Sequence, residues 1–142
     1  MTTTLDDIIR TLNLIRHPEG GWYAEMHRIA SPEGHRSPGT AIYYALGEGD
    51  RSHWHRVNAT EIWHYYAGAP IELSLSPGKG VHTHILGADL AAGQRPQAIV
   101  EPYHWQSARS LGAWTLVGCT VSPGFEFSGF EMAPPNWAPP AK

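Results

Sequence analysis

The hydrophobic pattern of this chain consists mostly of short segments of strand type, separated by glycine and proline. Residues 22–29 (WYAEMHRI) alternate. One face is expected to carry Trp22, Ala24, Met26 and Arg28, and the other Tyr23, Glu25, His27 and Ile29. Further candidate strands lie at residues 40–46, 52–57, 60–67, 71–76, 81–87, 97–101 and 113–121. Connectors such as GEGD, SPGKG and AAGQRP separate most of them, which predicts a sandwich or barrel rather than a parallel sheet with crossover helices.

A helical pattern is found only at the N-terminus, within residues 1–15. Thr4 is positioned to cap this helix, and its apolar stripe consists of Leu5, Ile8, Ile9 and Leu12. The proline-rich residues 133–142 predict an irregular tail. Because the sequence shows neither an internal repeat nor a linker, we expect a single domain over residues 1–142.

Composition restricts the class of protein. The chain has 142 residues, 42% of them hydrophobic, which suits one domain with a substantial core. A net charge of −3, with only 10 lysines and arginines, argues against a nucleic-acid partner. No apolar run is long enough for a membrane span, and the acidic N-terminus does not resemble a signal peptide, so we expect a cytoplasmic protein. The lone Cys119 excludes a disulfide framework.

Two of the nine histidines form the sequence His53-Trp54-His55, and in a strand both imidazoles are expected on one face. Glu61 follows six residues after His55, on the next candidate strand. Such a set can hold a divalent metal, such as Fe(II), Mn(II), Ni(II) or Zn(II), with open coordination positions. Without a metal, a carboxylate beside a buried histidine orients the imidazole and raises its pKa, which provides a group for proton transfer.

The segment from Gly47 to Gly68 resembles the first motif of the cupin superfamily. That motif consists of Gly, five residues, His-x-His, three or four residues, Glu, six residues and Gly. Its positions are occupied here by Gly47, His53, His55, Glu61 and Gly68. The gap between His55 and Glu61 is one residue longer than the motif allows.

Three longer strings, HPEGGWYAEMHR, HRVNATEIWHYYAG and GCTVSPGFEFSGFEM, resemble signature segments of the cupin-5 family. They extend from about residue 17 to residue 132. The resemblance implies an all-β fold, a double-stranded β-helix or jelly-roll barrel, with the short helix at its N-terminus. It also implies a small-molecule pocket inside the barrel and a homodimer. Members of this family are largely described as proteins of unknown function, so no particular reaction is implied.

The second cupin motif, Pro-x-Gly-x-x-His, is altered. Alignment of residues 101–108 (EPYHWQSA) with the family places Gln106 at the position of the metal-binding histidine. Glutamine is a poor ligand for a transition metal. His104 is expected to substitute only if the strand bulges. The candidate metal ligands are therefore His53, His55, Glu61 and His104.

The candidate substrate-binding residues are Trp63, Tyr65, Trp105, Gln106 and Glu25. Trp63 and Tyr65 share the strand face of Glu61 and are equally suited to a pocket wall and to the core. Glu25 and Arg28 either project into the pocket, as an acid and an anion-binding group, or lie on an edge strand that contacts a dimer partner. The edge-strand interpretation is preferred.

Three functional hypotheses follow. The first is an isomerase or epimerase of a sugar or keto acid, in which His55 and Glu61 transfer protons; similar metal-free cupin epimerases act on nucleotide sugars. The second is a metal-dependent enzyme such as a dioxygenase. The third is a protein that binds a small molecule without catalysis. The first and third hypotheses are preferred to the second, because the second cupin motif lacks its histidine.

Overall fold

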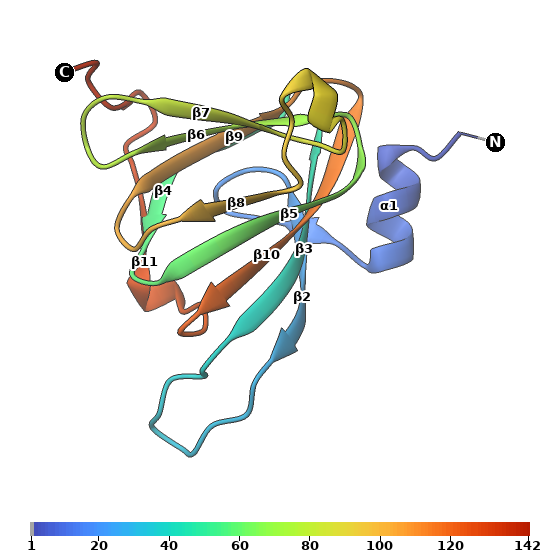
Figure 1. Cartoon of the computed structure of the whole chain (residues 1–142). Helices are drawn as coiled ribbons and strands as arrows, with labels where there is room; N and C mark the ends of the chain where they lie inside the picture. The colour runs from blue at the N-terminus through green and yellow to red at the C-terminus, as the bar shows by residue number, and fades with distance from the viewer. Residues whose placement is uncertain (1) are drawn as a thin grey trace.

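Two antiparallel β-sheets packed face to face form most of the structure (Figure 1). The computed structural model describes residues 2–142. The order of the six-stranded sheet is β1 (Ile15–Arg16), β2 (Trp22–Arg28), β3 (Thr40–Gly47), β10 (Trp114–Ser122), β5 (Thr60–Gly68) and β8 (Gln97–Val100). The order of the five-stranded sheet is β11 (Phe130–Met132), β4 (Arg51–Val57), β9 (Trp105–Ser110), β6 (Ile71–Ser76) and β7 (His82–Leu86). The two short 3-10 helices are η1 (Leu90–Ala92) and η2 (Phe127–Gly129).

Helix α1 (Leu5–Leu12) packs on the outer face of the six-stranded sheet, and its apolar stripe contacts Leu14, Ala45 and Leu116. The Thr4 hydroxyl accepts a hydrogen bond from the Asp7 backbone N–H, and the Asp7 carboxylate accepts one from the Thr4 backbone N–H. The predicted N-terminal helix is thus confirmed, with narrower bounds than residues 1–15. No helix among residues 2–142 has the length and hydropathy needed to cross a membrane.

The main hydrophobic core fills the space between the sheets. Trp63 of β5 packs edge-to-face on Tyr44 of β3, with ring centroids 5.8 Å apart, and Leu73 of β6 meets them from the opposite sheet. The predicted mainly β fold is therefore confirmed, but the sheets are not closed into a cylinder. The edge strands β1 and β11 are only two and three residues long, too short to complete a ladder between the sheets.

The C-terminal tail is irregular, as predicted, yet it is well packed. Trp137 lies against Trp105 of β9 and Trp54 of β4, with ring centroids 4.6 and 6.3 Å away. Ala133 completes this cluster on the outer face of the five-stranded sheet. Because the tail covers one face of β9 and the core covers the other, the first four residues of β9 are all buried and show no alternation.

Two β-bulges break the strand period. In β2 the register with β3 shifts between Glu25 and His27, which brings Arg28 onto the same side as Glu25. The prediction that Arg28 shares the face of Trp22 is therefore wrong. In β4 the register with β9 shifts between Ser52 and His55. These residues are three positions apart, yet both side chains contact Glu19.

Replacing Gly20 by alanine is expected to destabilise the protein more than the same change at Gly49. Both glycines have a positive φ, 108° and 79°, so each alanine carries a backbone strain of roughly 1–2 kcal/mol. A Cβ atom at Gly20 would also lie 2.1 Å from the carbonyl oxygen of Arg51, whereas one at Gly49 would meet no heavy atom within 4 Å. Urea unfolding measures the two losses of stability. Equal losses would contradict the close packing at Gly20.

Candidate functional site

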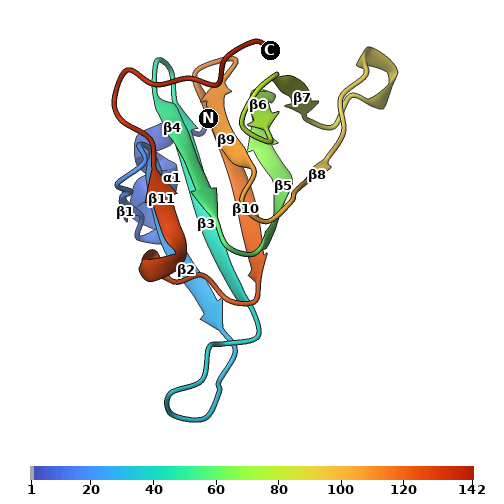
Figure 2. The same ribbon diagram turned by 90° about the vertical axis from the view of Figure 1, so that its left-hand side faces the viewer.

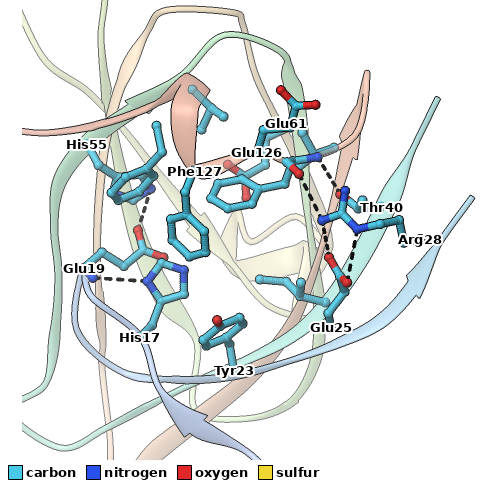
Figure 3. A pocket seen from close by; sticks show the side chains of 15 residues that line it. His17, Glu19, Tyr23, Glu25, Arg28, Thr40, His55, Glu61, Glu126 and Phe127 are labelled. Atoms are coloured by element: carbon cyan, nitrogen blue, oxygen red, sulfur yellow. Dashed lines mark hydrogen bonds and ion pairs between the residues drawn. The ribbon is translucent and has the colours of Figure 1, made fainter. Parts of the chain in front are cut away.

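A cavity of about 360 Å³ lies between the two sheets. Its wall combines residues of both sheets with the turn before β2 and the segment before β11 (Figure 3). The lining residues are His17, Glu19, Tyr23, Glu25, Arg28, Thr40, Ile42, His55, Val57, Glu61, Val121, Phe125, Glu126, Phe127 and Phe130. Figure 2 shows the strands β2, β3, β4 and β11 that supply this side of the molecule.

The turn His17-Pro18-Glu19-Gly20-Gly21 carries Glu19 into the interior. The backbone closes the turn, since the Gly20 N–H donates to the His17 carbonyl and the His17 N–H to the Gly21 carbonyl. The His53 backbone N–H donates to the Glu19 carbonyl at 2.8 Å, which anchors the turn to β4. Only 8% of Glu19 is exposed, so its carboxylate depends on partners within the protein.

His55 and Glu19 form a buried contact at the centre of the wall, with 2.6 Å between His55 Nε2 and Glu19 Oε2 (Figure 3). His55 Nδ1 lies 2.7 Å from the carbonyl oxygen of His53. Because a carbonyl oxygen only accepts, Nδ1 carries a proton, and the Nε2 contact must hold a second proton shared with Glu19. The Ser52 hydroxyl donates to the same Glu19 oxygen at 3.0 Å. The pair therefore stores one transferable proton.

The pKa directions of the site separate its two buried carboxyl groups. Burial favours the neutral form of Glu19, but the charge and hydrogen bond of His55 outweigh it and lower the pKa of Glu19. For Glu61, burial dominates and raises the pKa, although His55 opposes this. Burial alone would lower the pKa of His55, but Glu19, with smaller contributions from Glu61 and the His53 carbonyl, raises it. Glu19 therefore ionises more readily than Glu61, because a charged partner lowers the pKa of the first and burial raises that of the second.

Gln106 fixes the position of Glu61. The Trp63 indole N–H donates to Gln106 Oε1 at 2.8 Å, and the amide nitrogen of Gln106 donates to Glu61 Oε1 at 2.8 Å. An indole N–H only donates, so this contact determines the orientation of the amide. The buried Cys119 thiol also lies against the Glu61 carboxyl group, and a hydrogen bond between them lowers the pKa of Glu61 while raising that of Cys119. Glu61 itself lines the cavity.

His17 is neutral in this arrangement. Its Nδ1 accepts the backbone N–H of Glu19 at 3.1 Å, so the proton of the ring lies on Nε2. Burial lowers the pKa of His17 in the same direction. The 3.5 Å separation between Nδ1 and Glu19 Oε1 is therefore not an ion pair. Nε2 has no hydrogen-bond partner among residues 2–142 and is available to a ligand.

Apolar rings and a second charged pair form the other side of the cavity. Phe125, Phe127 and Phe130 pack together with ring centroids 4.9 to 6.0 Å apart. Arg28 and Glu25 lie across the cavity from His55 and Glu19, and Arg28 Nη2 is 2.6 Å from Glu25 Oε1 (Figure 3). Of the two interpretations of Glu25 and Arg28 given by the sequence, the preferred one was an edge strand at a dimer contact. The structure instead agrees with the other, in which both side chains project into the pocket.

The structure brings together some of the predicted site residues and separates others. His55, Glu61 and Glu25 line the cavity, with Gln106 directly behind Glu61. His53 does not share the face of His55, so that prediction is wrong. The bulge in β4 turns His53 outward, and its Nε2 lies 2.9 Å from the Pro134 carbonyl of the tail.

The remaining candidates lie outside the cavity wall. Trp63 is almost completely buried in the core, and Tyr65 packs against the same core with its hydroxyl donating to Gly68. Trp105 faces the tail and stacks under the Arg56 guanidinium. His104 lies in the turn before β9, where its backbone N–H donates to Glu101.

The donor set does not fit the metal centre that the cupin motif implies. His53 points away, His104 is in a turn, and the carbonyl oxygen of Gln106 already accepts the Trp63 N–H. No group of three histidine, cysteine, aspartate or glutamate side chains within residues 2–142 is arranged to hold a metal ion.

His17 and Glu19 are the site residues that the sequence analysis missed. They lie in a glycine-containing turn, far in sequence from His55, where strand period assigns no side chain to a face. The available signal was the unusual pair of ionisable residues in HPEGG, a string already used for the family resemblance.

The fold and the site together define a cupin-type jelly roll with a buried histidine–carboxylate pair. Residues 6–133 match the family described as "Cupin superfamily (DUF985)", and the chain belongs to this family. The family assignment made from the sequence is thus confirmed.

Solved structures extend the comparison. A protein from Shewanella oneidensis has 38% identity and a TM-score of 0.88, over 93% of this chain and 85% of that one. A hypothetical protein from Leishmania major has 29% identity and a TM-score of 0.85, over 92% and 88%. A dTDP sugar isomerase from Desulfovibrio desulfuricans has 14% identity and a TM-score of 0.61, over 87% and 88%, and shows similarity of fold alone. No protein with a curated description matches the chain.

Replacing Glu19 by glutamine is expected to lower the pKa of His55. Burial of the imidazole remains, and the carboxylate that opposes it is lost. NMR titration of the imidazole nitrogens measures the change. Glu25→Gln is the matched control, because Glu25 lines the same cavity but pairs with Arg28. An unchanged pKa of His55 in Glu19→Gln would rule out the proton-sharing contact.

The stability contributed by this pair is expected to be greatest at intermediate pH. The pKa of Glu19 is lowered, so its contribution is present above about pH 4.5 and is lost as the pH falls through the folded-state pKa. The pKa of His55 is raised, so its contribution is present below about pH 6.5 and is lost as the pH rises through the folded-state pKa. Urea unfolding of the wild type and of Glu19→Gln across this pH range measures the loss of stability at low pH and the loss at high pH. A variant with the wild-type pH dependence would disprove the assignment.

Proposed function

We propose that the cavity binds a small organic molecule and that the protein transfers protons on it, as an isomerase or epimerase does. The observation that carries this proposal is that two carboxyl groups near one imidazole have pKa values shifted in opposite directions. The pKa of Glu19 is lowered and that of Glu61 is raised. Environments that push the pKa values of neighbouring groups apart are a recurring feature of acid–base catalysts.

Glu61 is the proposed base. A carboxylate whose pKa is raised by burial is a stronger base than an ordinary glutamate carboxylate. Its Oε1 is held by Gln106, so Oε2 is the atom that removes a proton from a carbon next to a carbonyl group. The same atom then delivers the proton to the neighbouring carbon in an isomerisation, while a substrate oxygen returns a proton to His55, so the site regains its starting protonation state.

His55 is the proposed acid. Its Nε2–H is held by Glu19 in the cavity wall, and a substrate oxygen that shares this N–H receives the proton as negative charge develops on it. His17 supports the same oxygen, because its Nε2–H is free and its ring is neutral. A neutral imidazole polarises a carbonyl group without transferring a full charge to the site.

The cavity suits a small substrate. Its volume of about 360 Å³ lies at the lower end of ordinary ligand sites. The similarity in fold to a dTDP sugar isomerase supports the reaction class. By size, however, only one end of a nucleotide sugar would occupy this cavity, and a free keto acid or keto sugar fits it more fully.

The proposal is tested by exchange of carbon-bound hydrogen for deuterium in D2O. The probes are 2-oxo acids, free keto sugars and a dTDP-linked keto sugar, followed by proton NMR. We expect the wild type to accelerate exchange at one of these probes, and Glu61→Gln or His55→Ala to reduce the acceleration by ~10²–10⁴-fold.

Glu72→Gln is the matched control for this experiment, since Glu72 pairs with Arg109 and does not line the cavity. This variant should retain the wild-type rate. Full exchange activity in Glu61→Gln would refute the assigned base. Binding of the probes without any exchange would instead identify a protein that binds a metabolite without catalysis.

A further inference from the structure

The bulge in β2 places one arginine in the cavity wall. A regular strand would direct Arg28 to the face of Trp22 and Ala24, which packs under helix α1. The register shift between Glu25 and His27 turns it to the opposite side. Arg28 is the only lysine or arginine among the residues that line the cavity.

Three hydrogen bonds hold the guanidinium of Arg28 in place. Nε and Nη2 donate to the two oxygens of Glu25 at 3.3 and 2.6 Å, and Nη2 also donates to the Phe125 carbonyl at 3.0 Å (Figure 3). Nη1 makes no hydrogen bond to residues 2–142. A guanidinium that is held along one edge, with a free nitrogen at the other, is pre-oriented for an anionic group of a ligand.

The charges around the cavity are otherwise compensated. Glu19 pairs with His55 and Glu25 pairs with Arg28. Burial raises the pKa of Glu61, which makes its carboxyl group less readily ionised than an ordinary glutamate. Glu126 adds a negative charge at the rim, where it is half-buried and accepts a hydrogen bond from the Ser128 hydroxyl. The side chains of Arg28 and Glu25 are themselves 42% and 39% exposed, so water and salt screen all of these charges. The unused Nη1 of Arg28 suits one carboxylate and is insufficient for a phosphate dianion.

We propose that the ligand of this cavity is a small carboxylic acid with a flat or apolar body, whose carboxylate binds Arg28. The body contacts Phe125, Phe127 and Phe130, and the other end of the molecule reaches His55 and Glu61. The statement that this molecule is a substrate rests on the proposed function. The statement that it carries a carboxylate rests on Arg28 alone. The proposed substrate is thereby narrowed from sugars and keto acids to keto acids.

Three flat probes of nearly equal shape test the charge preference: benzoate (anionic), benzamide (neutral) and benzamidinium (cationic). Isothermal titration calorimetry gives their dissociation constants. We expect benzoate to bind the wild type about 10-fold more tightly than benzamide, and benzamidinium to bind most weakly. Equal affinities, preference for benzamidinium, or no binding of any probe would each overturn the proposal.

Two arginine variants test whether Arg28 causes the preference for benzoate. Arg28→Gln should remove the advantage of benzoate, whereas Arg109→Gln should keep it. Arg109 has the same two-point contact with a glutamate, Glu72, but lies outside the cavity. A full benzoate preference in Arg28→Gln would refute the assignment. If Arg28→Gln does not fold, Arg28→Lys, which keeps the charge without the planar fork, should retain only part of the preference.

Glu25→Gln distinguishes two ways of binding benzoate. Either Arg28 alone binds the carboxylate, or the Arg28–Glu25 pair binds the ligand as a unit. Removing the negative charge beside Arg28 should strengthen benzoate binding several-fold, because repulsion between the two carboxylates is lost. Weaker benzoate binding in this variant would contradict the proposal. Glu72→Gln, which removes a carboxylate outside the cavity, should bind benzoate with the wild-type charge preference. Failure of the carboxylate proposal therefore appears in binding, and failure of the proposed reaction appears only in the deuterium exchange.

Discussion

The short contact between His55 and Glu19 is the interaction on which the site depends. It joins the turn before β2 of the six-stranded sheet to strand β4 of the five-stranded sheet, beside the backbone hydrogen bond from His53 to the Glu19 carbonyl. A buried ion pair is costly to desolvate, and it is retained here with Ser52 and the His53 carbonyl satisfying the remaining polar atoms. Because such a pair adds little net stability, its presence agrees with the proton transfer proposed for this site.

The same contact determines the protonation of its neighbours. By holding Glu19 ionised, it adds negative charge near Glu61, and this reinforces the effect of burial on the pKa of Glu61. His17 remains neutral mainly because burial lowers its pKa; Glu19 opposes this shift and His55 adds to it. Three groups around His55 therefore differ in their readiness to carry charge: Glu19 has a lowered pKa, Glu61 a raised pKa, and His17 is a neutral donor.

Local irregularities, rather than the regular strands, position the functional side chains. The bulge in β4 directs His53 and His55 to different faces of the strand, so they do not form the histidine pair that a metal centre would use. The bulge in β2 brings Arg28 round to Glu25 and into the cavity. Bulges are frequent beside active sites because one extra residue redirects a side chain without disturbing the rest of the sheet.

The sequence by itself determined the mainly β fold, the capped N-terminal helix, the family, and His55 and Glu61 as neighbours. Each of these depends on local period or on short motifs. Only the tertiary structure decided that Glu19 is the partner of His55, since 36 positions of chain separate them. It also decided the directions of His53 and Arg28, because strand period predicts a side chain's face only where no residue is inserted into the ladder.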